Sequence, residues 1–212
     1  MGITYDLATL PEGGAVFHSG VAELTRLEGR AALRVSLNGQ MTRYDVPGTG
    51  YVDLPTFVAL PIWFEDGSIE VDILSRLNES APDSAQPLAG LAYRICGDRD
   101  RFDAVQVHPL TGTSLNPPSP RTRRAAQFFA FPEWPFDRLC PEGPSELGED
   151  IVPDSWIRLT LHIDGTRLTA LVDGVEALVI PVTKAAARRG DLGLFVDVGT
   201  EAYFSNLRIT PV

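Results

Sequence analysis

Residues 156–180 read WIRLTLHIDGTRLTALVDGVEALVI, and this stretch decides the fold class. Every second residue from Ile157 to Ile163 is apolar, so these side chains share one face of a half-buried strand. Asp164-Gly165 and Asp173-Gly174 then supply residues that tolerate positive φ at tight hairpin turns. The stretch therefore predicts a three-stranded antiparallel meander.

Similar strand signals recur along the chain, separated by Gly, Pro, Asn and Asp turns. The remaining predicted strands are 15–18, 21–28, 31–37, 50–53, 56–63, 68–77, 89–96, 101–108, 124–131, 191–197 and 202–210. Only 183–190 is typical of a helix, with Thr183 as N-cap and Gly190 as terminator. The pattern predicts an all-β sandwich of two antiparallel sheets with one short helix.

Length and charge restrict the classes of protein that this chain can belong to. A chain of 212 residues is within the range of a single sandwich, so we expect one domain over 1–212. The net charge of -10 argues against nucleic acid and against an anionic membrane surface as partners. No apolar run is long enough to span a bilayer, and the first basic residue is Arg26, so no signal peptide is expected. The expected location is cytoplasmic.

Motifs for metals, nucleotides and common hydrolases are missing from the sequence. Cys96 and Cys140 form no C-x-x-C pair, and we expect two reduced thiols. No H-E-x-x-H, P-loop, G-x-G-x-x-G or G-x-S-x-G occurs, and no calcium loop surrounds the Asp-Gly pairs. The sequence therefore predicts neither a metal nor a cofactor, and it does not indicate an oligomeric state.

Alternation along the central strands places one set of polar residues on the faces that point away from the core. If these strands are neighbours, their non-core faces share one surface, and its members are Glu70, Asp72, Arg94, Gln106, His108 and Gln127. Carboxylates, a guanidinium, an imidazole and amides together suit a polyhydroxylated ligand or acid–base chemistry. The alternative is an ordinary solvated face, because antiparallel sheets commonly have one.

Two proline-rich loops, 109–123 and 132–154, flank the predicted strand 124–131. Long loops in compact domains are usually functional, so we expect both to fold over the same end or face of the sandwich. The alternative is that they are ordinary surface loops, stiffened by proline, with no functional role. Trp134 lies in the second loop and is the best aromatic platform for a sugar ring, whereas Trp63 and Trp156 suit core packing equally well.

Several segments resemble the concanavalin A-like lectin/glucanase superfamily, closest to its laminin-G-like and keto-disaccharide-hydrolase-like branch. The matching segments, in order, are Gly67–Ile73 (GSIEVDI), Ala89–Arg94, Phe102–Val105, Asp154–Trp156, Gly193–Phe195 and Ala202–Ile209. The resemblance spans about residues 15 to 210. It implies a jelly-roll sandwich and a saccharide ligand. It does not imply one activity, because the superfamily includes lectins, glycosidases and lyases.

The laminarinase and lichenase type of glucanase carries E-x-D-x-(x)-E on its catalytic strand. Glu70 and Asp72 match this pattern, but Ser75 stands where the acid/base glutamate would be, which leaves no retaining pair at that position. The hypothesis is a carbohydrate-active protein that binds a small glycoside or oligosaccharide on the concave sheet and hydrolyses or eliminates it. Its roles are Glu70 and Asp72 as acidic pair, His108 as proton carrier, and Arg94, Gln106 and Gln127 as positioning groups. Two rivals stay open: a non-catalytic lectin-like module, and a protein-interaction domain.

Overall fold

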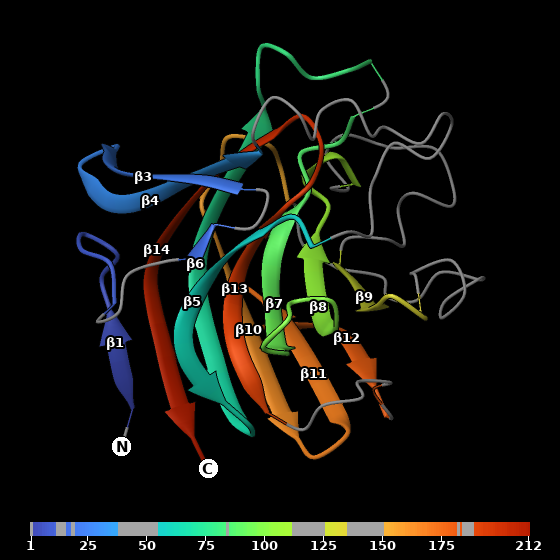
Figure 1. Ribbon diagram of the computed structural model, residues 1–212. Helices are drawn as coiled ribbons and strands as arrows, with labels where there is room; N and C mark the ends of the chain where they lie inside the picture. The colour runs from blue at the N-terminus through green and yellow to red at the C-terminus, as the bar shows by residue number, and fades with distance from the viewer. Residues whose placement is uncertain are drawn as a thin grey trace.

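Two antiparallel β-sheets pack face to face in the computed structural model of this protein (Figure 1). The structure describes residues 2–11, 16–17, 20–37, 55–83, 85–111, 126–134, 151–181, 183 and 189–212. The two ends of the chain lie side by side, because the first strand pairs with the last one.

The larger sheet has eight strands. Their order is β12 (Val175–Ile180), β11 (Arg167–Val172), β10 (Ile157–Asp164), β6 (Gly67–Leu77), β14 (Thr200–Pro211), β4 (Arg30–Leu37) and β3 (Gly20–Leu27), and β1 (Ile3–Tyr5) also pairs with β14. The smaller sheet has six strands, in the order β2 (Val16–Phe17), β5 (Phe57–Phe64), β13 (Gly190–Val196), β7 (Ala89–Ile95), β8 (Phe102–Val107) and β9 (Ala126–Phe131). One short 3₁₀ turn, η2 (Pro109–Thr111), follows β8.

These strands confirm the predicted fold class, including the meander formed by β10, β11 and β12. Asp173 and Gly174 have φ values of 49° and 84°, the positive values that the tight turn between β11 and β12 requires. Strand β1 was not predicted. The predicted strand 50–53 and most of the predicted helix 183–190 lie outside the described residues, and Gly190 begins β13. Among the described residues no helix is long and apolar enough to span a membrane.

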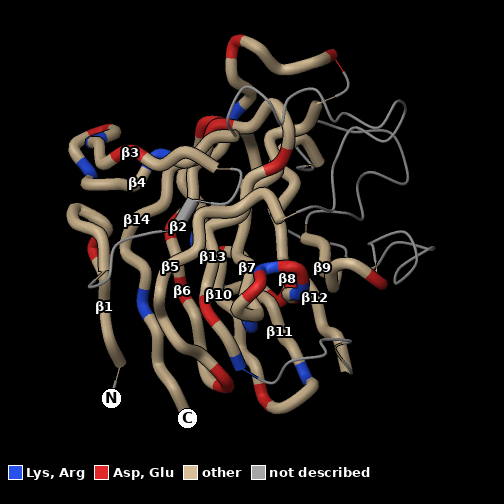
Figure 2. Tube along the Cα trace, in the orientation of Figure 1, with Lys and Arg blue, Asp and Glu red and all other residues tan. Residues whose placement is uncertain are grey.

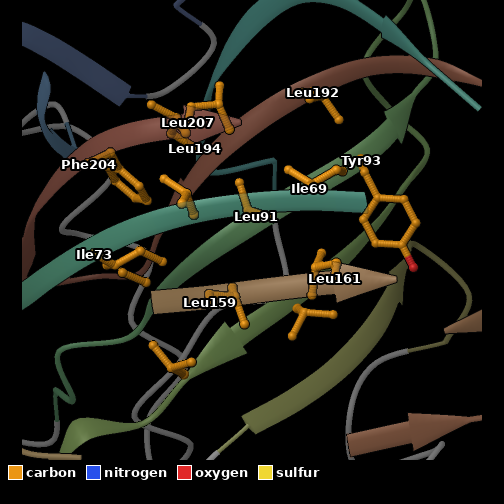
Figure 3. Close-up of a cluster of buried hydrophobic side chains, with 14 of the residues drawn as sticks. Ile69, Ile73, Leu91, Tyr93, Leu159, Leu161, Leu192, Leu194, Phe204 and Leu207 are labelled. Atoms are coloured by element: carbon orange, nitrogen blue, oxygen red, sulfur yellow. The ribbon is translucent and has the colours of Figure 1, made fainter. Parts of the chain in front are cut away.

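The main core lies between the sheets (Figure 3). Period-two alternation supplies it: β6 contributes Ile69 and Ile73, β10 contributes Leu159 and Leu161, and the six-stranded sheet contributes Leu91 among others. Each of these five side chains is almost fully removed from water. Burial of one such side chain stabilises the fold by about 1.5–3 kcal/mol.

The outer faces of the two sheets differ in polarity. On the six-stranded sheet a second buried cluster gathers phenylalanines, with Phe57 and Phe102 edge to face at 5.0 Å and Phe129 and Phe195 at 5.4 Å. On the eight-stranded sheet, β6 and β14 carry charged side chains, whereas β5 of the other sheet carries none (Figure 2). The polar surface that faces solvent is therefore on the eight-stranded sheet.

Candidate functional site

The residues predicted to share one face are divided between the two sheets. Glu70 and Asp72 lie on the outer face of the eight-stranded sheet, because their neighbours Ile69, Val71 and Ile73 point into the core. Gln106, His108 and Gln127 belong to the six-stranded sheet and its other outer face. The prediction of a common face is therefore wrong. Alternation along a strand shows which side chains share a face of that strand, but it does not show which sheet the strand joins.

Asp72 is held by three donors and is almost fully buried. Arg30 Nη1 donates to it at 2.9 Å, Arg158 Nε at 2.8 Å and Asn206 Nδ2 at 2.7 Å. Burial by itself would raise the pKa of this carboxyl. The hydrogen bonds from Arg158 and Asn206 and the positive charges of Arg158 and Arg30 outweigh that effect, so the pKa lies below its ordinary value. Asp72 therefore serves this surface as a permanent carboxylate that orients two arginines.

Arg94 lies at the end of the sandwich and not on a face. Its backbone has φ of 54°, which turns the strand end, and its side chain is 3% exposed. Nη2 donates to Asp66 at 2.8 Å, to the Gly165 carbonyl at 2.6 Å and to the Glu65 carbonyl at 3.2 Å. Each of these acceptors belongs to a hairpin of the eight-stranded sheet or leads into it, so Arg94 ties the sheets together.

Three of the predicted residues do come together. Gln106 Nε2 donates to Gln127 Oε1 at 3.2 Å and lies 3.5 Å from His108 Nε2, and all three side chains are nearly fully buried. Trp134 packs partly against the main core and exchanges backbone hydrogen bonds with Ala130. Most of loops 109–123 and 132–154 lies outside the described residues, so a cover over this cluster stays a prediction, as do the roles assigned to its members.

A different group of residues forms the largest hollow that we describe, and sequence reasoning missed it. The hollow has a volume of about 980 Å³ and lies on the outer face of the eight-stranded sheet, where we call it the Glu201 hollow. Its lining consists of Arg34, Ser36, Leu37, Arg76, Leu77, Asn78, Glu79, Ser80, Glu201 and Tyr203. Pairing explains the convergence: Glu201 on β14 is opposite Ser36 of β4 on one side and Arg76 of β6 on the other.

Glu201 is 8% exposed and is enclosed by two guanidiniums and a phenol. Arg34 donates to Oε2 through Nε at 2.7 Å and through Nη2, and Arg76 donates to Oε1 through Nε at 2.9 Å and Nη2 at 2.7 Å. The Tyr203 hydroxyl donates to Oε1 at 2.8 Å and accepts from Arg76 Nη2 at 3.0 Å. Each guanidinium directs two N–H groups at one oxygen of the carboxylate, and these charge-assisted hydrogen bonds hold the group together.

The electrostatics of the hollow follow from this group. Burial would raise the pKa of Glu201, but hydrogen bonds from Arg76, Tyr203 and Arg34 bring the pKa below its ordinary value. Burial and the adjacent Glu201 charge raise the pKa of Tyr203, so its hydroxyl keeps its proton. The lining holds two arginines and two glutamates and is therefore balanced in charge. It offers hydrogen-bond donors and acceptors in fixed positions and carries no net formal charge.

Sequence reasoning could have found only part of this group. Alternation places Arg34 with Ser36 and Glu201 with Tyr203 on polar faces of their strands. However, Arg34 and Glu201 are 167 residues apart, and only the insertion of β14 between β4 and β6 brings them together. Within the described part of the chain, no group of His, Cys, Asp and Glu side chains is placed to hold a metal ion.

Comparison with known proteins supports the fold. Neither a family model nor a curated protein sequence matches the chain. The carbohydrate-binding module CBM66 from Bacillus subtilis has 15% identity and a TM-score of 0.52, over 92% of this chain and 97% of that one. A Bacillus subtilis protein of unknown function with a galectin-like fold has 13% identity and a TM-score of 0.56, over 99% and 94%.

An enzyme has the same fold. The β-glucanase of Bacillus licheniformis has 11% identity and a TM-score of 0.56, and the match covers 100% of this chain and 98% of the glucanase. Binding modules and glucanases therefore share the architecture. The fold is a two-sheet jelly-roll sandwich, the architecture that the resemblance in sequence predicted.

Proposed function

We propose that this protein binds a neutral saccharide in the Glu201 hollow and does not turn it over. The observation that carries the proposal is the fixed arrangement of Arg34, Arg76, Glu201 and Tyr203 in a hollow of about 980 Å³. That volume is at the upper end of the range for small-molecule sites, about 300–1,000 Å³. The shared fold with a carbohydrate-binding module supports the same class of ligand.

The chemistry of the lining suits hydroxyl groups. A sugar hydroxyl donates one hydrogen bond and accepts others, so it needs both kinds of partner. The guanidiniums are donors, the carboxylates are acceptors, and the Ser36 and Ser80 hydroxyls can act as either. Because Glu201 neutralises part of the arginine charge, a charged ligand has no advantage over a neutral one. The arrangement favours a neutral, polyhydroxylated ligand.

The directions of two pKa shifts support binding without turnover. Glycoside hydrolysis needs one carboxyl group that carries a proton at working pH and delivers it to the leaving oxygen. Glu201 and Asp72 both have pKa values below the ordinary range, because arginines hold them as carboxylates. The predicted proton carrier His108 belongs to the other sheet and cannot assist them. Glu201 and Asp72 are thus acceptors and not proton donors, which favours recognition over hydrolysis.

The first experiment is a calorimetric screen with detection of products. The probes are gluco-, xylo- and fructo-oligosaccharides, each from disaccharide to hexasaccharide. We expect one series to bind without being cleaved. Ser36→Ala removes one hydroxyl from the hollow and should weaken binding about threefold to tenfold, the effect of one net hydrogen bond.

Thr4→Ala is the matched control, because it removes a hydroxyl from the exposed strand β1 outside the hollow. It should leave binding unchanged. Absence of binding by every series would refute a saccharide site and favour the protein-interaction alternative. Cleavage of a bound probe would refute the non-catalytic assignment and restore the hydrolase or lyase hypothesis.

A further inference from the structure

The Glu201 hollow is followed by two more hollows on the same outer face. The Asp72 hollow, of about 470 Å³, is lined by Asp72, Trp156, Arg158 and Thr160 among others. The His162 hollow, of about 540 Å³, is lined by Ser68, His162, Thr169 and Thr210 among others. Strand β6 contributes a side chain to each of the three, so the hollows follow one another along a single strand.

The spacing of these hollows is regular. Their polar β6 side chains are Arg76, Asp72 and Ser68, four residues apart in each step. At about 3.3 Å per residue, each step is about 13 Å and the whole run is about 26 Å. A ligand that reaches all three hollows must be a linear chain of several sugar units.

A buried apolar cluster, with the partly exposed Trp156 packed against it, lies between the Glu201 hollow and the Asp72 hollow. Ala32, Leu74 and Tyr203 form a buried cluster there, and Trp156 packs against it. The Arg30 guanidinium lies 4.4 Å from the centre of the indole, while Trp156 Nε1 donates to Glu28 at 3.1 Å. The partly exposed indole of Trp156, beside these polar hollows, suits a sugar chain, whose hydroxyls and C–H faces alternate.

Glu70 lies between the Asp72 hollow and the His162 hollow. On β6 it is opposite Thr160 of β10 and Arg208 of β14, and it is partly exposed on the outer face. It makes neither a hydrogen bond nor an ion pair with any residue in the described part of the chain, in contrast to Asp72 and Glu201. Its carboxylate is therefore available to accept hydrogen bonds from a ligand.

We infer that the ligand is a linear oligosaccharide that lies along β6, with its first units in the Glu201 hollow and later units against Trp156 and Glu70. This inference rests on the proposed function, because it assigns a length and a direction to the same ligand. Glu70 is a ligand acceptor in this arrangement and has no role in proton transfer.

The test measures affinity against chain length by calorimetry, with the same three oligosaccharide series. The hexasaccharide of the binding series should bind at least about tenfold more tightly than the disaccharide, because the additional hollows contribute further hydrogen bonds. Glu70→Ala should remove several-fold of this gain and leave disaccharide affinity unchanged. Thr160→Val, which keeps a β-branched residue on β10, should act in the same way. Glu176→Ala on the edge strand β12 is the control and should change neither affinity.

Equal affinity for disaccharide and hexasaccharide would overturn the extended site and leave the Glu201 hollow as a single binding site. Equal losses for both lengths in Glu70→Ala, with unchanged thermal unfolding, would also overturn it. If no oligosaccharide of any length binds, the proposed function itself fails. The two failures are therefore distinguishable.

Discussion

Asp103 is a fully buried acid in the core between the sheets. It lies on β8 opposite Tyr93 of β7, and none of its carboxyl oxygens has a hydrogen bond of good geometry within the described part of the structure. Burial raises the pKa of Asp103 to about 7, and the positive charge of Arg94 and the nearby Tyr93 hydroxyl oppose this only in part. The side chain is therefore neutral in mildly acidic solution and charged in basic solution.

This acid makes stability depend on pH. The unfolded chain releases the Asp103 proton near its ordinary pKa of about 4, whereas the folded protein keeps it up to about pH 7. The free energy of unfolding should therefore fall between about pH 4 and pH 7 and become level above that. Asp103→Asn cannot ionise, so it should remove this slope and be more stable than the wild type at pH 8, by at most about 4 kcal/mol.

Urea denaturation at several pH values measures the effect. Glu133→Gln, at an exposed acid beyond β9, is the control and should keep the slope of the wild type. A slope that survives unchanged in Asp103→Asn would show that the buried carboxyl is not its source.

At the scale of elements, β7 and β8 pass unusually close to each other at Gly90. A Cβ added there would lie 1.9 Å from the Val105 carbonyl oxygen and 2.7 Å from the Gln106 Cα, and both of these are backbone atoms. Backbone cannot move aside as the end of a flexible side chain can. Only glycine is compatible with this pairing.

Gly90→Ala should therefore destabilise the protein by about 1–3 kcal/mol, the usual range for overpacking, or by more if β7 and β8 separate. Gly97→Ala is a matched control, since a Cβ there would meet nothing within 4 Å. Urea denaturation of both variants is the measurement. Equal stability of the two would contradict the close approach of the strands.

The positions of the strands were largely predictable from the sequence, but the grouping of the strands into two sheets was not. Alternation and Asp-Gly turns located β6, β10, β11 and most other strands within a few residues. Strand β1 is only three residues long, which is too short to show alternation. Sheet membership depends on long-range pairing, so Glu70 and His108 were wrongly placed together, and the Arg34–Glu201 pair was not expected.

At the scale of the whole molecule, Arg94 is the polar link between the layers. It belongs to the six-stranded sheet. Its acceptors Glu65 and Asp66 lie in the connection from β5 to β6, and Gly165 lies in the turn between β10 and β11 of the other sheet. Arg94→Met would leave the Glu65 and Gly165 carbonyls without this donor and Asp66 Oδ1 with only the Gly165 N–H. Since Asp66 is partly exposed and can regain water, we expect a loss of about 2–4 kcal/mol in the free energy of unfolding.

Arg101→Met is the control for Arg94→Met in the same denaturation experiment. Arg101 is 55% exposed and lies 3.6 Å from Asp100. An exposed pair of this kind contributes at most about 1 kcal/mol. A similar small effect of both substitutions would show that Arg94 does not hold the two sheets together.

The hydrogen bonds that Arg34, Arg76 and Tyr203 donate to Glu201 also affect the rate of ligand association. Arg34, Arg76 and Tyr203 are already fixed by their hydrogen bonds to Glu201. Because the hollow is preorganised, ligand binding requires no slow rearrangement of these side chains. Association should then proceed at a similar rate for every sugar that fits. Selectivity between sugars would then depend on the dissociation rate, that is, on the residence time of each sugar in the hollow.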